Sequence, residues 1–187
     1  MAPRDGWRGA RMDEWLNADP ASLVDEVVTA KWMTGEEVDG DDPAARLAVG
    51  AEIARAQADL RGEVEAGPDG RILVHREMAL SDEALDALAP GDALGICWAF
   101  DRKGAHGYDA RAGGARRVVT AWAEPGDVAW AQVLAAWSSG EGEARLAAGA
   151  GVELVGIADR DGTPRRADLA GSEFGTARTL PTGPSPR

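Results

Sequence analysis

Two carboxylates spaced two residues apart, Glu141 and Glu143, are the strongest candidates for chemistry in this 187-residue chain. They follow a small, flexible segment, 138–140, and precede the segment 144–157, which is predicted to be extended apart from a break at its glycines. Residues i and i+2 of an extended segment point the same way. Both carboxylates are therefore expected to face one site at the mouth of a strand.

Arg76 supplies a positive charge upstream, at the end of another predicted strand, 72–76. A guanidinium forms paired, planar hydrogen bonds with phosphate groups. An arginine on one strand and two carboxylates on another are thus suited to binding a phosphorylated, positively charged cofactor. The alternatives remain open: the carboxylates as solvated turn residues, and Arg76 as a surface partner of Glu77 or Asp82, which is a common and weak kind of ion pair.

The elements that must position these residues divide the chain in two. The first 70 residues are predicted to be helical, because Asp19-Pro20 and Asp42-Pro43 are typical helix starts. After a turn at 67–70 the sequence predicts strands at 71–75, 94–100 and 118–123, a short helix capped by Ser81, and an amphipathic helix with the apolar face Trp130, Val133, Leu134 and Trp137.

Two segments carry a resemblance to the ADP-ribosyltransferase fold of mono-ADP-ribosylating toxins. The segment VHREMAL (74–80) resembles the first core strand of that family, and GEGEARL (140–146), with the strand 152–157, resembles its E-x-E turn and closing hairpin. The resemblance implies an α+β fold: a pair of short mixed sheets with an N-terminal helical region. The expected domains are a helical region (1–70), a catalytic core (71–160) and a polar, partly disordered tail (161–187).

The resemblance also implies a reaction. Arg76 would hold the phosphates of NAD, Glu143 would stabilise the oxocarbenium-like ribose formed as nicotinamide leaves, and Glu141 would orient or deprotonate the acceptor. The E-x-E form implies transfer of ADP-ribose to an arginine, and a protein acceptor is expected. With water as acceptor the protein would be an NAD glycohydrolase. The remaining alternative is a binding protein on the same fold without catalysis.

In this chain the segment that corresponds to the family's middle motif departs from the usual serine-rich form. The corresponding segment, GICWAFD (95–101), has no serine. Trp98 or Phe100 is a candidate to stack on the nicotinamide, with a place in the core as the alternative for Trp98. A second family pattern, formed by histidine, tyrosine and glutamate, would use His75, Tyr108 and Glu143.

The amino-acid composition limits the classes of partner that the protein is expected to bind. The net charge is −12, of which residues 1–70 contribute −9 (7 basic and 16 acidic residues), so broad nucleic-acid binding is unfavourable. Cys97 is the only cysteine, and with two histidines in the chain no metal centre is expected. The sequence predicts no secretory leader and contains no stretch of about 20 apolar residues. A cytoplasmic protein is therefore expected, and the Ala- and Gly-rich composition favours a bacterial or phage origin.

Overall fold

The computed structural model describes residues 12–67, 69–88, 92, 94–105 and 115–166. The α-helices are α1 (Met12–Leu16), α2 (Val24–Met33), α3 (Pro43–Glu63), α4 (Asp82–Ala87) and α5 (Trp130–Ser138), and the short 3-10 helices are η2 (Pro20–Leu23) and η3 (Pro125–Asp127). The strands are β1 (Ile72–Ala79), β2 (Cys97–Ala99), β3 (Arg116–Ala123), β4 (Glu143–Arg145), β5 (Glu153–Asp159) and β6 (Pro164–Arg166).

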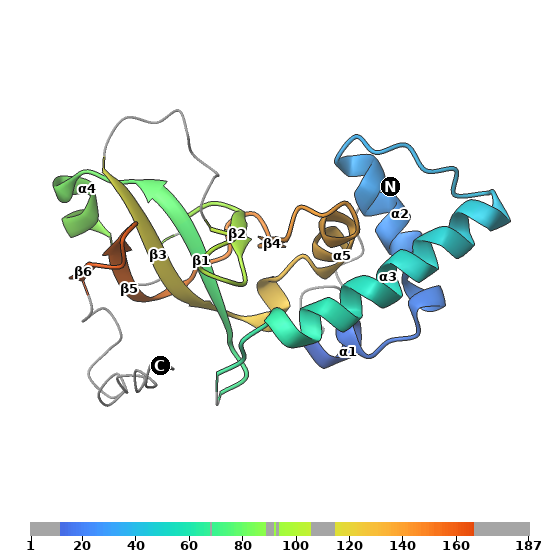
Figure 1. The fold of residues 1–187 in the computed structure, drawn as a ribbon, viewed down its shortest axis with the longest axis horizontal. Helices are drawn as coiled ribbons and strands as arrows, with labels where there is room; N and C mark the ends of the chain where they lie inside the picture. Colours follow the sequence, from blue (N-terminus) through green and yellow to red (C-terminus); the bar gives the residue numbers. More distant parts are fainter. Residues whose placement is uncertain (1–11, 68, 89–91, 93, 106–114, 167–187) are drawn as a thin grey trace, which may run out of the picture.

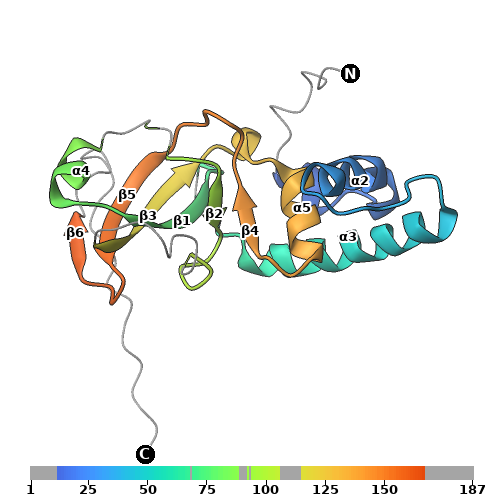
Figure 2. The same ribbon diagram turned by 90° about the horizontal axis from the view of Figure 1, so that it is seen from above.

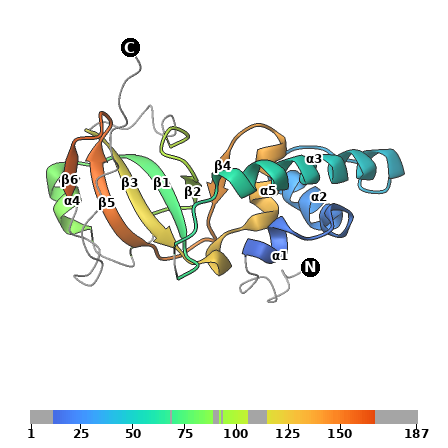
Figure 3. The same ribbon diagram turned by 60° about the horizontal axis from the view of Figure 1, so that its bottom comes forward.

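The strands form one antiparallel sheet in the order β4-β2-β1-β3-β5-β6 (Figure 1, Figure 3). This confirms an α+β class, but the expected pair of short mixed sheets is replaced by a single sheet. The physical reason is the length of β1 and β3, which pair over all eight residues. β5 continues the sheet at the far side of β3, and β6 adds a strand within the segment that the sequence predicts to be a polar tail.

The helices lie beyond the β4 edge of the sheet, apart from α4, which lies near the opposite edge (Figure 1, Figure 2). In this helical layer α5 packs against both α2 and α3. Because α5 lies between β3 and β4 in the chain, the polypeptide leaves the sheet for the helical layer and returns at the carboxylate pair. The β4 strand is therefore positioned by both parts of the molecule.

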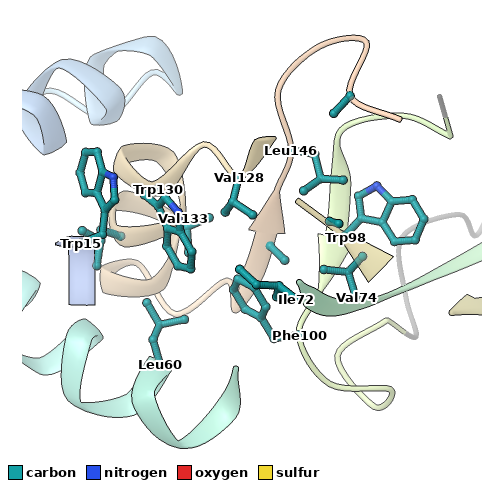
Figure 4. Close-up of a cluster of buried hydrophobic side chains, with 14 of the residues drawn as sticks. Trp15, Leu60, Ile72, Val74, Trp98, Phe100, Val128, Trp130, Val133 and Leu146 are labelled. Atoms are coloured by element: carbon teal, nitrogen blue, oxygen red, sulfur yellow. The ribbon is translucent and has the colours of Figure 1, made fainter. Parts of the chain in front are cut away.

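One apolar core joins the two parts (Figure 4). At its centre the Phe100 ring stacks on Trp130, with centroids 6.2 Å apart and planes 12° apart, and meets Trp137 at 6.0 Å. Trp98 is 1% exposed, and its indole N–H donates to the carbonyl oxygen of Gly95. The two aromatic side chains considered for nicotinamide stacking thus lie in the core, the alternative that the sequence left open for Trp98.

Local signals explain where the helices begin. The Asp19 side chain accepts a hydrogen bond from the Ala21 N–H, and Asp42 accepts from Ala44 and Ala45, so both Asp-Pro starts are confirmed as caps. Ser81 caps α4 in the same way. None of the described helices combines the length and the apolar character needed to cross a membrane.

Candidate functional site

The two segments that carry the resemblance, 74–80 and 140–146, and the divergent middle segment, 95–101, contribute to neighbouring strands. β2, which carries the middle segment, lies between β4 and β1 in the sheet. Ala99 is opposite His75 on one side and opposite Glu143 on the other, while Cys97 is opposite Arg145. Residues in register share a face of the sheet. The side chains of Glu143, Arg145 and Cys97 therefore lie on one face, at the β4 edge beside the helical layer.

Glu143 is buried, with 2% of its surface exposed. One carboxylate oxygen, Oε2, accepts a hydrogen bond of 2.6 Å from Nη2 of Arg145. The other oxygen, Oε1, is buried and has no hydrogen-bond partner in the described part of the chain. A buried carboxylate with an unsatisfied oxygen is unfavourable by itself. Burial raises the pKa of the neighbouring Cys97 thiol, and so does the hydrogen bond that the thiol contributes to this carboxylate.

Glu141 has a different environment from Glu143. It precedes β4, is exposed, and is separated from the strand by Gly142, whose φ of 61° interrupts the extended backbone. The alternation that we expected to align the two carboxylates therefore does not extend to Glu141. It lines a hollow of about 500 Å³ that also includes the buried Lys31 and the two serines at the end of α5, Ser138 and Ser139. Its negative charge nevertheless reaches the Arg145 guanidinium.

Arg76 is held at the other side of β2. Its Nη1 donates to the carbonyl oxygen of Cys97 at 3.1 Å, and its Nε is buried without a partner among the described residues. The surface pairs considered from the sequence are not formed, because Glu77 pairs with Arg116 and Asp82 pairs with Arg117. His75 is opposite Ala99, which is opposite Glu143, so the side chain of the next residue in β1, Arg76, lies on the other face of the sheet. Arg76 therefore does not share a face with Glu143 and Arg145.

Gly95 makes this position of Arg76 possible. Its φ is +91°, and a Cβ at position 95 would overlap the Arg76 guanidinium. We expect Gly95→Ala to displace the Arg76 guanidinium from the Cys97 carbonyl and to lower the free energy of unfolding by about 1–3 kcal/mol, the cost of losing one charge-assisted hydrogen bond. Urea unfolding would measure this loss. Gly140→Ala, also at positive φ but with open space around its Cβ, is the control for backbone strain. Equal effects of the two substitutions would contradict this role for Gly95.

Sequence reasoning missed Arg145 and gave Cys97 only a structural role. Burial opposes the charge of Arg145, but the hydrogen bond and the charge of Glu143 outweigh burial and raise the pKa of Arg145. Burial also raises the pKa of the Cys97 thiol, as does its interaction with the Glu143 carboxylate, and the charges of Arg145 and Arg76 reduce this rise. Extending the i, i+2 rule by one step, from Glu143 to Arg145, was the signal available in the sequence.

The raised pKa of Cys97 leads to a prediction. Because the thiolate is the reactive form, we expect slow alkylation of Cys97 by iodoacetamide at pH 7.5 and a rate that increases above the pH at which an ordinary cysteine reacts. Glu143→Gln removes a negative neighbour, so it is expected to lower the pKa of Cys97 and to shift the rate profile to lower pH. Mass spectrometry across pH 6 to 10 would follow the reaction. An unchanged profile in the variant would show that the carboxylate does not act on the thiol.

Of the remaining candidates, His75 lies in the same row of the sheet as Ala99 and Glu143. His75 is half-buried, with Nδ1 3.0 Å from the Thr120 hydroxyl, and burial, followed by the charge of Arg102, lowers its pKa. Tyr108 lies outside the described residues. Among the described residues no group of histidine, cysteine and carboxylate side chains could hold a metal ion.

Comparison with known proteins gives no information about the site. No protein-family profile, no curated protein and no solved structure matches the chain. What this chain can do therefore has to be argued from Arg76, Cys97, Glu143 and Arg145, and from the strands that carry them.

Proposed function

We propose that the protein is an NAD-dependent mono-ADP-ribosyltransferase, with an arginine side chain of a protein as the favoured acceptor. One observation carries the proposal: the strands with Arg76, the middle segment and Glu143 are neighbours, in the order β1, β2 and β4. They are separated by up to 67 residues in the chain. A chance match of two short sequence motifs would not require their strands to be adjacent.

The charged groups on these strands are of the types that NAD requires. A guanidinium such as that of Arg76 binds phosphate oxygens, and a carboxylate such as that of Glu143 accepts hydrogen bonds from ribose hydroxyls. The register places these two side chains on opposite faces of the sheet. Loss of nicotinamide builds positive charge on the ribose, and a carboxylate placed there stabilises the transition state. Glu143 is assigned that role.

Glu141 is assigned to the acceptor. It lies in the hollow next to the site, exposed to an approaching partner, and an acceptor arginine has to be oriented or deprotonated before it attacks the ribose. Cys97 takes the position beside Glu143 on the middle strand, where the family motif has serine in its usual form. Its thiol is a weak hydrogen-bond donor and is proposed to help hold the Glu143 carboxylate.

The test is direct. Purified protein is incubated with NAD, with and without cell lysate as a source of acceptors, and released nicotinamide is measured by chromatography. Label transferred from NAD carrying an isotope in its adenosine would identify modified proteins. Release of nicotinamide with labelled protein supports the transferase, and release without it indicates an NAD glycohydrolase. No release under either condition would contradict the proposal.

A second candidate is a non-catalytic binding protein. The observation that favours it is the ion pair between Glu143 and Arg145, which neutralises the proposed catalytic carboxylate. The acidic helical layer would then be the functional surface, and it contains a hollow of about 790 Å³ lined by Trp32, Glu36, Glu37 and Asp39, among others. This candidate predicts that NAD is not cleaved. It also predicts a basic partner whose binding is lost in the Glu37→Lys variant.

A further inference from the structure

Trp32, in the last turn of α2, is exposed to solvent. Its side chain is 62% exposed, whereas the other tryptophans of the described ranges are buried or half-buried. The next residue, Met33, is 71% exposed. A tryptophan ring is large and apolar and is usually mostly buried. Two consecutive exposed apolar side chains, one of them a tryptophan, are therefore a candidate contact surface for another molecule.

The Trp32 ring is held in place at the edge of a hollow. Its indole N–H donates a hydrogen bond of 2.8 Å to the carbonyl oxygen of Val38, which ties the ring to the loop between α2 and α3. The hollow, of about 790 Å³, is lined by residues 35–39 of that loop together with Trp32. The loop lies at the opposite end of the molecule from α4 (Figure 1). Because the ring is already fixed, little conformational entropy is lost when a partner packs on it.

Glu36 anchors the loop that forms the wall of this hollow. Its Oε1 accepts a hydrogen bond of 2.8 Å from the ammonium group of Lys31, and its Oε2 accepts one of 3.0 Å from the Ser139 hydroxyl at the end of α5. The hydrogen bond from Lys31, which is itself buried, lowers the pKa of Glu36. The loop is thus tied to both α2 and α5, and the charge of Glu36 is matched by a cation of the protein.

The other two carboxylates of the hollow have no such cation. Glu37 and Asp39 are exposed, and neither forms an ion pair within the described part of the chain. An arginine side chain suits this arrangement, because its planar guanidinium stacks on an aromatic face and also forms paired hydrogen bonds with a carboxylate. The acidic surface repels the phosphates of nucleic acids and of anionic membranes. Charge complementarity therefore favours a basic protein.

We infer that residues 32–39 dock a basic segment of a partner protein, with one arginine of that segment stacked on Trp32 and paired with Glu37 or Asp39. The hollow that contains Glu141 also includes Gly35 and Glu36, so the docked segment lies beside the carboxylate assigned to the acceptor. Such docking serves the transferase and the binding protein alike. The inference therefore does not depend on cleavage of NAD.

The experiment titrates isotope-labelled protein with synthetic peptides at low ionic strength. Each peptide repeats the unit Gly-Ser-X, where X is arginine, lysine or citrulline, the uncharged analogue of arginine with nearly the same shape. The NMR signal of the Trp32 indole N–H, assigned by its absence in Trp32→Leu, reports on the ring, and the backbone amide signals of residues 35–39 give the dissociation constant. We expect the arginine peptide to shift the indole signal and to bind about fivefold more tightly than the lysine peptide. The citrulline peptide is expected not to bind.

Two sets of substitutions test the ring and the carboxylates separately. Trp32→Leu keeps an apolar side chain without the aromatic face and is expected to weaken binding of the arginine peptide by about fivefold or more. Glu37→Gln combined with Asp39→Asn removes both unpaired charges, with an expected loss of about fivefold that shrinks as salt is added. The matched control, Glu83→Gln combined with Asp86→Asn, removes two exposed carboxylates on α4 and is expected to leave binding unchanged.

Several results would overturn the docking surface: no binding of the arginine peptide, equal binding of the citrulline peptide, wild-type affinity in Trp32→Leu, or equal losses in the two double variants. Sedimentation equilibrium tests a second copy of this chain as the occupant, and a dimer that is lost in Trp32→Leu would also overturn the inference. The assay of nicotinamide release keeps the proposed function separate. Release without peptide binding leaves the transferase and removes the docking surface, whereas peptide binding without release does the reverse.

Discussion

Replacing Glu143 with glutamine is expected to lower the rate of nicotinamide release by about a hundredfold or more, the usual effect of removing one group that stabilises transition-state charge. Glutamine has nearly the same shape, so the side chain still fills its buried position between β2 and the helical layer. It carries no negative charge to stabilise the ribose cation. Release of nicotinamide under single-turnover conditions is the measurement.

Glu141→Gln is the matched control for this result. Because Glu141 is exposed before β4 and is assigned to the acceptor, its loss is expected to reduce transfer of ADP-ribose while hydrolysis of NAD by water continues. The two substitutions, two residues apart, are thus expected to affect different steps: Glu143→Gln the release of nicotinamide, and Glu141→Gln the transfer to the acceptor. Wild-type turnover in Glu143→Gln would remove the enzyme assignment and favour the binding protein.

Phe100→Ala is expected to lower the free energy of unfolding by about 3–5 kcal/mol, the range for truncating a buried phenylalanine. The ring is 3% exposed and lies against both Trp130 and Trp137, at the junction of sheet and helical layer. Single domains have about 5–15 kcal/mol of stability in total, so this loss would be a large share. Urea unfolding followed by tryptophan fluorescence would measure it.

Leu47→Ala serves as the control for Phe100→Ala, because Leu47 is 78% exposed on α3 and its truncation is expected to change stability by about 0.5 kcal/mol or less. Trp98, buried on β2, is expected to behave like Phe100. A stable Phe100→Ala protein with weakened NAD binding would instead support the stacking role first considered for this ring.

Features that depend on a few neighbouring residues could be predicted from the sequence. The caps at Asp19, Asp42 and Ser81 are examples, since each side chain bonds an N–H two or three residues away. The apolar spacing of Trp130, Val133 and Leu134 likewise predicted a helix with one buried face, and all three side chains are buried in α5.

Features that depend on strand pairing were predicted less well. The sequence did not reveal that β1 and β3 pair over their full length, which produces one sheet in place of two. It also did not reveal that a short polar segment, Pro164–Arg166, would find an open edge at β5. Within the site, the backbone turn at Gly142 separates Glu141 from β4, and the ion pair with Arg145 holds Glu143. Neither feature follows from the spacing of the two carboxylates.

The position of α5 in the helical layer determines how the protein can be dissected. A fragment limited to residues 71–160 would contain α5 without α2 and α3, which pack against it, so part of the apolar surface of α5 would be uncovered. Exposed apolar patches of that kind promote aggregation. Any function of the acidic helices is therefore better mapped with point substitutions in the whole chain than with deletions.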